Sequence, residues 1–339
     1  MYKKKKKGKT TLLNRILKEK HGMKICVIEN EFGDVGIDNL LIENNKSIST
    51  KEQIIEMLNG CICCTVRGDL INVIHKVLKE NPNIEMILIE TTGLADPAPI
   101  IQSFYTDPKL SARLKLDGVI TVVDCINFTS HLEKDEQFEN ECIEQIAFAD
   151  RILLNKVDLL EKTLQEKFEK ENLPKNEFKD FFQKEINSLE EKIKSINNAV
   201  SIFTSSFSDV SLEKILSIGA FDLDKVVEME PEFFYNFDHQ HDDRVTSVCF
   251  SIDKEIEGEV LNEWFSSLVR NHGKDIFRAK GIFAIKGTND KYAFQGVHML
   301  IDMDAIGEWK EGETKNCKLV FIGRNLDKMD LKDSFYSLF

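Results

Sequence analysis

The sequence predicts an α/β fold in which helices flank a parallel sheet, with a small α+β domain at the carboxyl end. Short β-branched runs alternate with amphipathic stretches from residue 8 to about residue 205, as in a parallel sheet covered by helices. The runs are almost wholly apolar, which is typical of strands buried on both faces; they cover residues 23–28, 86–89, 118–123, 151–154 and 200–203. Such sheets bind ligands beyond the carboxyl ends of their strands, so we expect the functional residues there.

The other segments complete a two-domain organisation. Residues 159–198 carry Leu and Phe at helical spacing among many Lys, Glu and Asn, and Pro174 interrupts them, so they predict two surface helices inserted before the last strand. Residues 221–244 are acidic and aperiodic and predict a linker. Strand-like and helical patterns then predict an antiparallel sheet with one helix; they cover residues 245–252, 258–270, 277–285, 292–303 and 318–323. We expect one domain over residues 1–220 and another over residues 245–339.

Composition excludes several classes of partner. The net charge of −13 argues against nucleic acid or an anionic membrane as the main partner, because both require a concentrated basic surface. No run approaches the roughly 18 apolar residues that span a bilayer, and the start lacks the apolar segment of a signal peptide. The default location is therefore the cytoplasm. Eight cysteines are too few for a disulfide scaffold in a chain of this length.

A phosphate-binding element stands near the start of the chain. Gly8-Lys9-Thr10-Thr11 precedes residues 12–17, whose Leu and Ile share one face of a predicted helix. The amino terminus of a helix offers free N–H groups to a phosphate, Lys9 can reach the terminal phosphates, and the Thr10 hydroxyl can hold Mg²⁺. Together with the base-recognition element described below, this element predicts a P-loop GTPase-type parallel sheet.

The start of this element departs from the full pattern. A glycine is expected five residues before Gly8, with a buried strand ahead of it, but position 3 is Lys3 and residues 4–7 are all lysine. The first strand of the sheet is thus missing. Either the start of the chain is truncated or mis-assigned, or the nucleotide site is impaired; the intact order of the downstream motifs favours truncation.

Two further elements complete the predicted nucleotide site. The run that ends at Glu90 delivers an acid that can hold Mg²⁺, and Gly93 can offer its N–H to a γ-phosphate; a strand-end acid followed by an ordinary turn is the alternative. Asn155-Lys156-Val157-Asp158 follows another apolar run. Asp158 can accept from guanine N1–H and its amino group, Asn155 can contact the other base edge, and the Lys156 stem can cover the ring.

A cluster of thiols lies between these elements. Cys61, Cys63 and Cys64 stand within four residues, close enough to occupy one face of a tetrahedral Zn²⁺ site while a fourth position stays open for transfer. Redox sensing is the main functional alternative. The thiol cluster lies in the chain between the segments predicted to sense the γ-phosphate. This position suggests that GTP binding and hydrolysis change the geometry of the thiolates and so release the metal. The five isolated cysteines are expected to be small core residues.

Taken in order, these motifs resemble the CobW-like family of GTPase metallochaperones, in the branch of zinc-regulated GTPase metalloprotein activators. The resemblance rests on Gly8-Lys9-Thr10-Thr11-Leu12-Leu13-Asn14, Glu29-Asn30-Glu31-Phe32-Gly33, Gly60-Cys61-Ile62-Cys63-Cys64, Glu90-Thr91-Thr92-Gly93 and Asn155-Lys156-Val157-Asp158, and it continues into Arg278-Ala279-Lys280-Gly281 and Gln295-Gly296-Val297-His298. It implies slow GTP hydrolysis with Mg²⁺, delivery of zinc or cobalt to a client metalloenzyme and, in the eukaryotic zinc branch, methionine aminopeptidase as that client. His239 and His241 resemble the family's histidine-rich stretch in reduced form; loose metal binding and a solvated linker are equally compatible with them.

Three functions remain open from the residues alone. The first is an enzyme, a GTPase that delivers metal. The second is a metal-binding or metal-buffering protein whose nucleotide site is impaired by the lysines of residues 3–7 and the missing strand. The third is a nucleotide-dependent switch without metal, which Zn²⁺ binding through Cys61, Cys63 and Cys64 would exclude.

Overall fold

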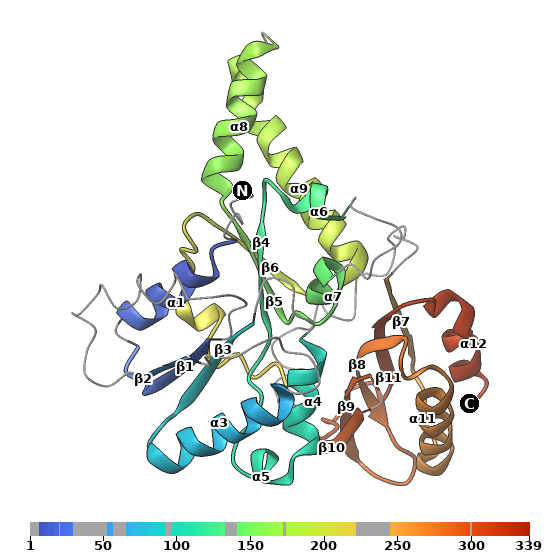
Figure 1. Ribbon diagram of the computed structural model, residues 1–339. Helices are drawn as coiled ribbons and strands as arrows, with labels where there is room; N and C mark the ends of the chain where they lie inside the picture. Colours follow the sequence, from blue (N-terminus) through green and yellow to red (C-terminus); the bar gives the residue numbers. More distant parts are fainter. Residues whose placement is uncertain are drawn as a thin grey trace.

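The computed structural model describes residues 7–19, 21–29, 53–56, 66–91, 97–132, 141–171, 174–221, 245–298 and 300–339. Two three-stranded parallel sheets with flanking helices form the first part of the molecule, and a five-stranded antiparallel sheet with two helices forms the second (Figure 1). The predicted fold class is confirmed. No helix within the described ranges is long and apolar enough to cross a membrane.

Five of the six described strands of the two parallel sheets match the expected apolar runs, and the strand Gln53–Glu56 was not predicted. In the first, β1 (Ile25–Glu29) pairs with β2 (Gln53–Glu56) and β3 (Met86–Glu90). In the second, β5 (Arg151–Asn155) pairs with β4 (Ile120–Asp124) and β6 (Ser201–Ser205). The register sets Asp124, Asn155 and Ser205 side by side at the carboxyl ends, where ligands bind in sheets of this kind.

Helices cover both faces of these sheets. The helix α1 (Lys9–Lys18) packs across both sheets at once, because its buried leucines and Ile16 share one hydrophobic cluster with Val27 of β1 and with Val122 and Leu153 of the second sheet. On the other face α3 (Val66–Glu80) and α4 (Ala98–Thr106) pack against β1, and the short helix α5 (Pro108–Ser111) follows. The helices α6 (Phe128–Leu132) and α7 (Glu141–Ala147) lie between β4 and β5 in the chain.

A large cavity separates the two parallel sheets. Among the described strands none lies between β3 and β4, and residues of both line a space of about 620 Å³ that α1 covers on one side and α3 and α4 on the other. All five residues of β3 are half-buried, whereas all five of β5 are buried. This space is open to solvent along part of its lining, so the cavity is a wide cleft rather than an enclosed void.

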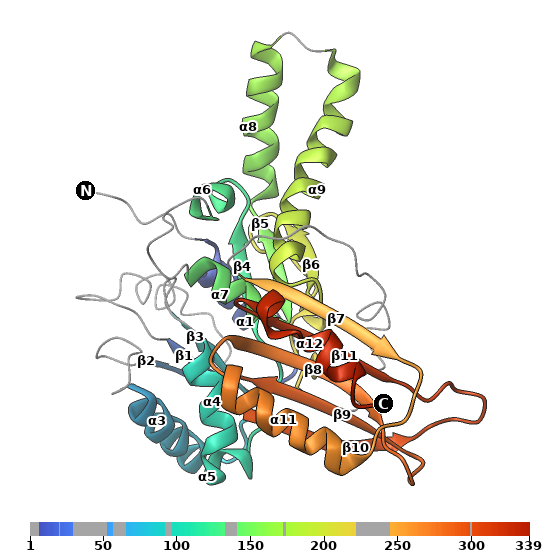
Figure 2. The ribbon, with the colours of Figure 1, turned by 90° about the vertical axis from the view of Figure 1, so that its right-hand side faces the viewer.

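The insertion between β5 and β6 is a helical hairpin. Its helices are α8 (Val157–Lys170) and α9 (Phe178–Ile196), and a 3-10 turn, η1 (Lys175–Glu177), comes just before α9. Phe168 of α8 packs against Phe178 and Phe181 of α9, which joins the two helices by aromatic contacts. The hairpin projects from the body of the molecule in both views (Figures 1 and 2).

The carboxyl-terminal part is an antiparallel sheet with the order β10-β9-β8-β11-β7. Its strands are β7 (Thr246–Ile252), β8 (Ile276–Ala284), β9 (Asp290–Val297), β10 (Leu300–Glu308) and β11 (Cys317–Gly323). The helices α11 (Gly258–His272) and α12 (Leu331–Tyr336) pack on one face, and a 3-10 turn, η4 (Leu326–Met329), precedes α12.

One expectation for this sheet is wrong in detail. Residues 292–303 were expected as one strand-like segment, but β9 ends at Val297 and β10 returns from Leu300 in antiparallel pairing. The chain reverses at His298, whose φ of 53° places it in the left-handed region. Position 298 is not a glycine, asparagine or proline, the residues that usually mark such a turn, and apolar residues stand on both sides of it. The predicted linker falls largely on residues 222–244, which lie outside the described residues, and so do His239 and His241.

Candidate nucleotide and metal site

The phosphate-loop lysine points at the end of β3. Lys9 is the first residue of α1, and its Nζ lies 3.3 Å from Glu90 Oε1 and donates a hydrogen bond to the Thr91 carbonyl. The Lys9 side chain keeps 30% of its surface exposed and that of Glu90 14%. The sequence-predicted cation and acid are therefore brought together, and a polyphosphate arriving here would compete with Glu90 for Lys9. Thr10 is half-buried and Thr11 is exposed at the same helix end.

Gly8 is required by its surroundings. Its φ of 113° lies in a region that favours glycine. A Cβ at this position would stand 2.2 Å from Asn155 Nδ2 and 2.9 Å from Ser208 Oγ. Any larger residue would therefore push the amino terminus of α1 away from the ends of β5 and β6.

Asn155 joins the phosphate loop to the loop after β6. Its Nδ2 donates to the Lys7 carbonyl at 3.1 Å and to Ser208 Oγ at 3.1 Å, while its Oδ1 accepts from Ser205 Oγ at 3.0 Å and from the Ser208 N–H at 2.9 Å. Ser208 Oγ in turn donates to the Gly8 carbonyl at 3.0 Å. The buried amide is thus saturated by protein groups, although the sequence predicted a contact with the base edge.

Lys156 is fixed by an acid that the sequence analysis did not single out. Its Nζ lies 2.7 Å from Asp124 Oδ2, and its backbone is left-handed with φ of 69°. Burial opposes ionisation of Asp124, but hydrogen bonds from Lys156 and Asn127 outweigh it and hold the pKa of this carboxyl below its ordinary value. Asp124 ends an apolar run as Glu90 does, and that shared position was the signal available in the sequence.

Asp158 offers an open carboxylate at the same edge. It lies half-buried in the first turn of α8, where its backbone N–H donates to Ser206 Oγ at 3.1 Å. Within the described part of the chain, its carboxylate receives no hydrogen bond or ion pair. Both oxygens can therefore accept from a ligand with two adjacent donors, as guanine has.

The structure describes only some of the residues predicted to bind metal. Cys61, Cys63, Cys64 and Gly93 lie outside the described residues. In the described ranges no three His, Cys, Asp or Glu side chains gather to hold a metal ion. Thr10 and Glu90, the oxygen donors predicted for Mg²⁺, stand at the head of α1 and at the end of β3, and hard oxygen ligands of this kind suit that ion.

The five isolated cysteines behave as core residues rather than ligands. Cys26, Cys125 and Cys317 are buried, and Cys142 and Cys249 are half-buried. Burial raises the pKa of Cys26 to about 11 and that of Cys125 to about 12. These thiols stay protonated at neutral pH, which disfavours both metal binding and redox reactivity.

The sequence comparisons identify the family. Residues 7–183 match the nucleotide-binding domain described as CobW/HypB/UreG, and residues 245–338 match the cobalamin synthesis protein cobW C-terminal domain. The chain belongs to the CobW family. It is 32% identical to the zinc chaperone YjiA of Escherichia coli over 98% of this chain and 95% of that protein. It is 28% identical to the zinc-regulated GTPase metalloprotein activator 1 of Saccharomyces cerevisiae, over 96% and 79% of the two chains.

The solved structures agree. The Zn(II)-bound YjiA GTPase from E. coli matches with a TM-score of 0.70 at 26% identity, over 98% of this chain and 95% of that one. The predicted resemblance to this family of GTPase metallochaperones is thereby confirmed. This chain contains both CobW-family domains. The contact between them helps to hold the strands that carry the candidate nucleotide site.

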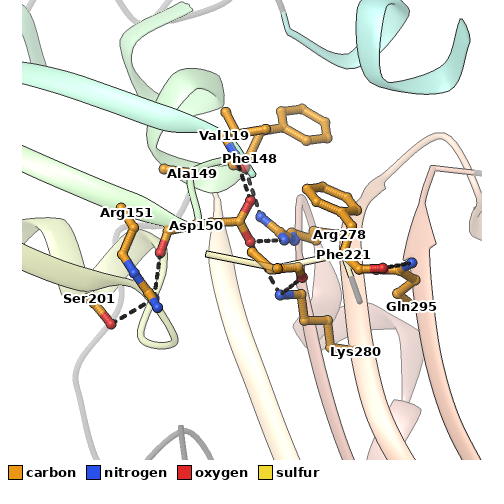
Figure 3. A network of polar contacts seen from close by, with 12 residues as sticks. Val119, Phe148, Ala149, Asp150, Arg151, Ser201, Phe221, Arg278, Lys280 and Gln295 are labelled. Carbon is orange, nitrogen blue, oxygen red and sulfur yellow. Dashed lines mark hydrogen bonds and ion pairs between the residues drawn. The ribbon is translucent and has the colours of Figure 1, made fainter. Parts of the chain in front are cut away.

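In this CobW-family chain a buried ion cluster joins the two domains (Figure 3). Asp150, just before β5, pairs through Oδ1 with Arg278 and with Lys280 at 3.2 Å, both from β8, and its Oδ2 accepts from the Val119 N–H at 2.9 Å. Burial opposes the charge on Asp150, but the two cations outweigh it and lower its pKa. Apolar residues of both domains, including Phe148 and Phe277, pack in one cluster around this contact.

Proposed function

We propose that this chain is a GTP-binding and GTP-hydrolysing metallochaperone that binds zinc, or cobalt, through Cys61, Cys63 and Cys64 and delivers it to a client metalloenzyme. The observation that carries the proposal is the hydrogen-bonded bridge of Asn155 between the phosphate loop and the loop after β6. This bridge supports the proposal because it ties the loop before Lys9 to the sheet edge where Asp158 follows β5, and a guanine nucleotide needs a phosphate site and a base site at one edge. The printed names of the relatives, zinc chaperone and zinc-regulated GTPase metalloprotein activator, support the same reading.

In this proposal the phosphates bind at the head of α1. The backbone N–H groups that follow Gly8 would face the β-phosphate, Lys9 would leave Glu90 for the terminal phosphates, and the Thr10 hydroxyl would hold Mg²⁺. Glu90, released from Lys9, would hold Mg²⁺ directly or through water. Gly93 offers its N–H to the γ-phosphate. Thr11, in the first turn of α1, is part of the proposed phosphate site. A Mg²⁺ ion held by Thr10 and Glu90 would neutralise phosphate charge.

Asp158 reads the base, and Asn155 and Lys156 position it. The Asp158 carboxylate accepts from guanine N1–H and the exocyclic amine, and the wrong base would leave it unpaired. The saturated amide of Asn155 supports a bracing role, in place of the direct base contact expected from the sequence. The Lys156 stem, fixed by Asp124, offers an apolar surface to the ring.

The metal is the cargo of the protein. Three thiolates favour Zn²⁺, and Co²⁺ is compatible with the same ligands. Coupling to GTP follows from the order of the motifs, since Cys61, Cys63 and Cys64 lie in the chain between β1 and Glu90. Methionine aminopeptidase is the client implied by the resemblance to the eukaryotic branch, and its binding by this chain is part of the proposal.

Zinc titration with GTP, GDP or no nucleotide tests metal, nucleotide and coupling together. We expect the Zn²⁺ affinity to differ between the GTP- and GDP-bound forms, because linkage requires a difference if hydrolysis is to release metal. Serine at positions 61, 63 and 64 should abolish tight binding, while Cys249→Ser, in β7, serves as the control. Equal affinities in all three nucleotide states would refute the delivery mechanism.

A second candidate is a metal-binding protein with an impaired nucleotide site. The cavity between β3 and β4 and the lysines of residues 3–7 favour it, because both fall where a phosphate loop needs support. Under this alternative, Zn²⁺ binds with unchanged affinity at any GTP concentration, and purified chain releases no phosphate from GTP. A Lys9→Ala variant provides the background rate for that measurement.

A further inference from the structure

The loop that follows β6 is held by hydrogen bonds to several residues of the candidate nucleotide site. The Ser208 N–H donates to Asn155 Oδ1 at 2.9 Å, and Ser208 Oγ donates to the Gly8 carbonyl at 3.0 Å. Ser206 Oγ accepts from the Asp158 N–H at 3.1 Å. Within this loop the backbone is therefore determined by contacts to the phosphate loop and to the start of α8.

Phe207 is the exception within this pinned loop. Its side chain is 74% exposed, more than any other large hydrophobic side chain in the described ranges. Its φ is 54°, and that of Ser208 is 58°, so two successive residues other than glycine adopt the left-handed region. An aromatic residue is uncommon there and, being exposed, gains no packing in return. Backbone outliers held by over-determined surroundings are typical of ligand sites.

The position of Phe207 relative to Asp158 indicates which ligand. Phe207 follows directly on Ser206, whose Oγ is hydrogen-bonded to the backbone of Asp158. Phe207 and Asp158 are therefore held near one another through Ser206. The base edge would meet Asp158, and the flat face of the base would still need an apolar partner.

We propose that Phe207 stacks on the guanine ring of the bound nucleotide and sets its affinity, while Asp158 sets its identity. The inference rests on the guanine-nucleotide binding proposed above. Together with the Lys156 stem, held through its ion pair with Asp124, Phe207 gives the base two apolar surfaces. The left-handed backbone turns an aromatic side chain outward at a position where glycine would satisfy the chain alone.

The alternative to the guanine ring is a partner protein that covers Phe207. Ile126 and Leu159, 37% and 44% exposed, follow the ends of β4 and β5 and so lie at the same sheet edge as Phe207. The pinned loop and the hydrogen bond from Asp158 to Ser206 favour the base, because neither is needed for an apolar docking surface.

Calorimetric titration of the full chain with GDP tests the proposal. Phe207→Ala should weaken GDP binding about tenfold, the range seen when a base loses an aromatic partner, and Phe207→Tyr should preserve it. Phe207→Gly should weaken binding equally while leaving the melting temperature unchanged or higher, because glycine relieves the left-handed backbone. Met303→Ala, which removes an exposed side chain from β10, is the matched control.

Base identity separates stacking from recognition. Asp158→Asn should shift preference from GDP to xanthosine diphosphate, whose C2 carbonyl accepts from an amide. Adding Phe207→Ala to that variant should weaken xanthosine diphosphate by the same factor, since stacking ignores the base edge. Unchanged GDP affinity in Phe207→Ala, or equal losses in Phe207→Ala and Phe207→Tyr, overturns the inference alone. Failure of the unsubstituted chain to bind GDP overturns both this inference and the proposed function.

Discussion

Asp150 and Arg278 form a buried ion pair between the two domains (Figure 3), and Asp150 precedes β5, whose opposite end is Asn155. Arg278 keeps 5% of its side-chain surface exposed and Asp150 2%. Arg278 also donates to the Phe148 carbonyl at 2.8 Å, which fixes the approach to the same strand. One fully buried strand therefore connects the interdomain contact to the residue that joins the phosphate loop to the loop after β6.

Removing the carboxylate should destabilise the protein strongly. Asp150→Asn would leave Arg278 and Lys280 buried without their counter-charge, and breaking a buried pair in this way costs about 3–5 kcal/mol. The free energy of unfolding, measured in urea, should fall by that amount. Lys286→Ala removes half of an ion pair whose side chains are 50% and 58% exposed, and we expect a change below about 0.5 kcal/mol. Similar losses in the two variants would contradict the assigned importance of the buried cluster.

The free energy of unfolding should fall in acid as the carboxylates of Asp150 and Asp124 become protonated. The folded-state pKa values of Asp150 and Asp124 are lowered, so each contributes stability that is present above the unfolded pKa near 3.9 and lost as the pH falls through the folded value. Urea midpoints should therefore drop most steeply below about pH 4. Asp150→Asn should flatten that dependence relative to the unsubstituted chain. An unaltered slope in the variant would show that other carboxylates dominate acid unfolding.

The bridge of Asn155 should couple the two loops energetically. Asn155→Ala deletes bonds to Lys7, Ser205 and Ser208 and leaves their polar groups buried, so we expect a loss of about 3 kcal/mol and weaker nucleotide binding. Ser208→Ala removes only the hydroxyl contacts. In a double-mutant cycle the two losses should be less than additive, because the variants share the bond between Asn155 and Ser208. Strict additivity would mean that the loops are held independently.

Local pattern was sufficient to predict five of the six described parallel strands and the placement of Lys9 and Glu90, but it missed the short strand β2 (Gln53–Glu56). Continuous apolar runs identify buried parallel strands, and the residues just after them share one edge of the sheet. The bridge was not predictable, because Asn155 meets Lys7 across 148 residues and Ser208 meets Gly8 across 200. The role of Asp150 was likewise not predictable, because its two cationic partners come from the other domain.

The cavity between β3 and β4 leads to the last prediction. Both strands expose an unpaired edge to it among the described strands, and Lys7 lines it at the end where α1 begins. Replacing residues 1–6 by an engineered strand of about five apolar β-branched residues and a glycine-rich loop should therefore add a parallel strand between them.

The engineered chain should melt at a higher temperature, and amide exchange should slow in both Met86–Glu90 and Ile120–Asp124, because each edge gains hydrogen bonds. A chain of equal length with proline at alternate strand positions is the control, since proline cannot donate to a ladder. Protection of only one of the two strands would mean that the added segment extends one sheet without joining them. Faster GTP hydrolysis by the engineered chain than by the control would further connect the cavity to the phosphate loop.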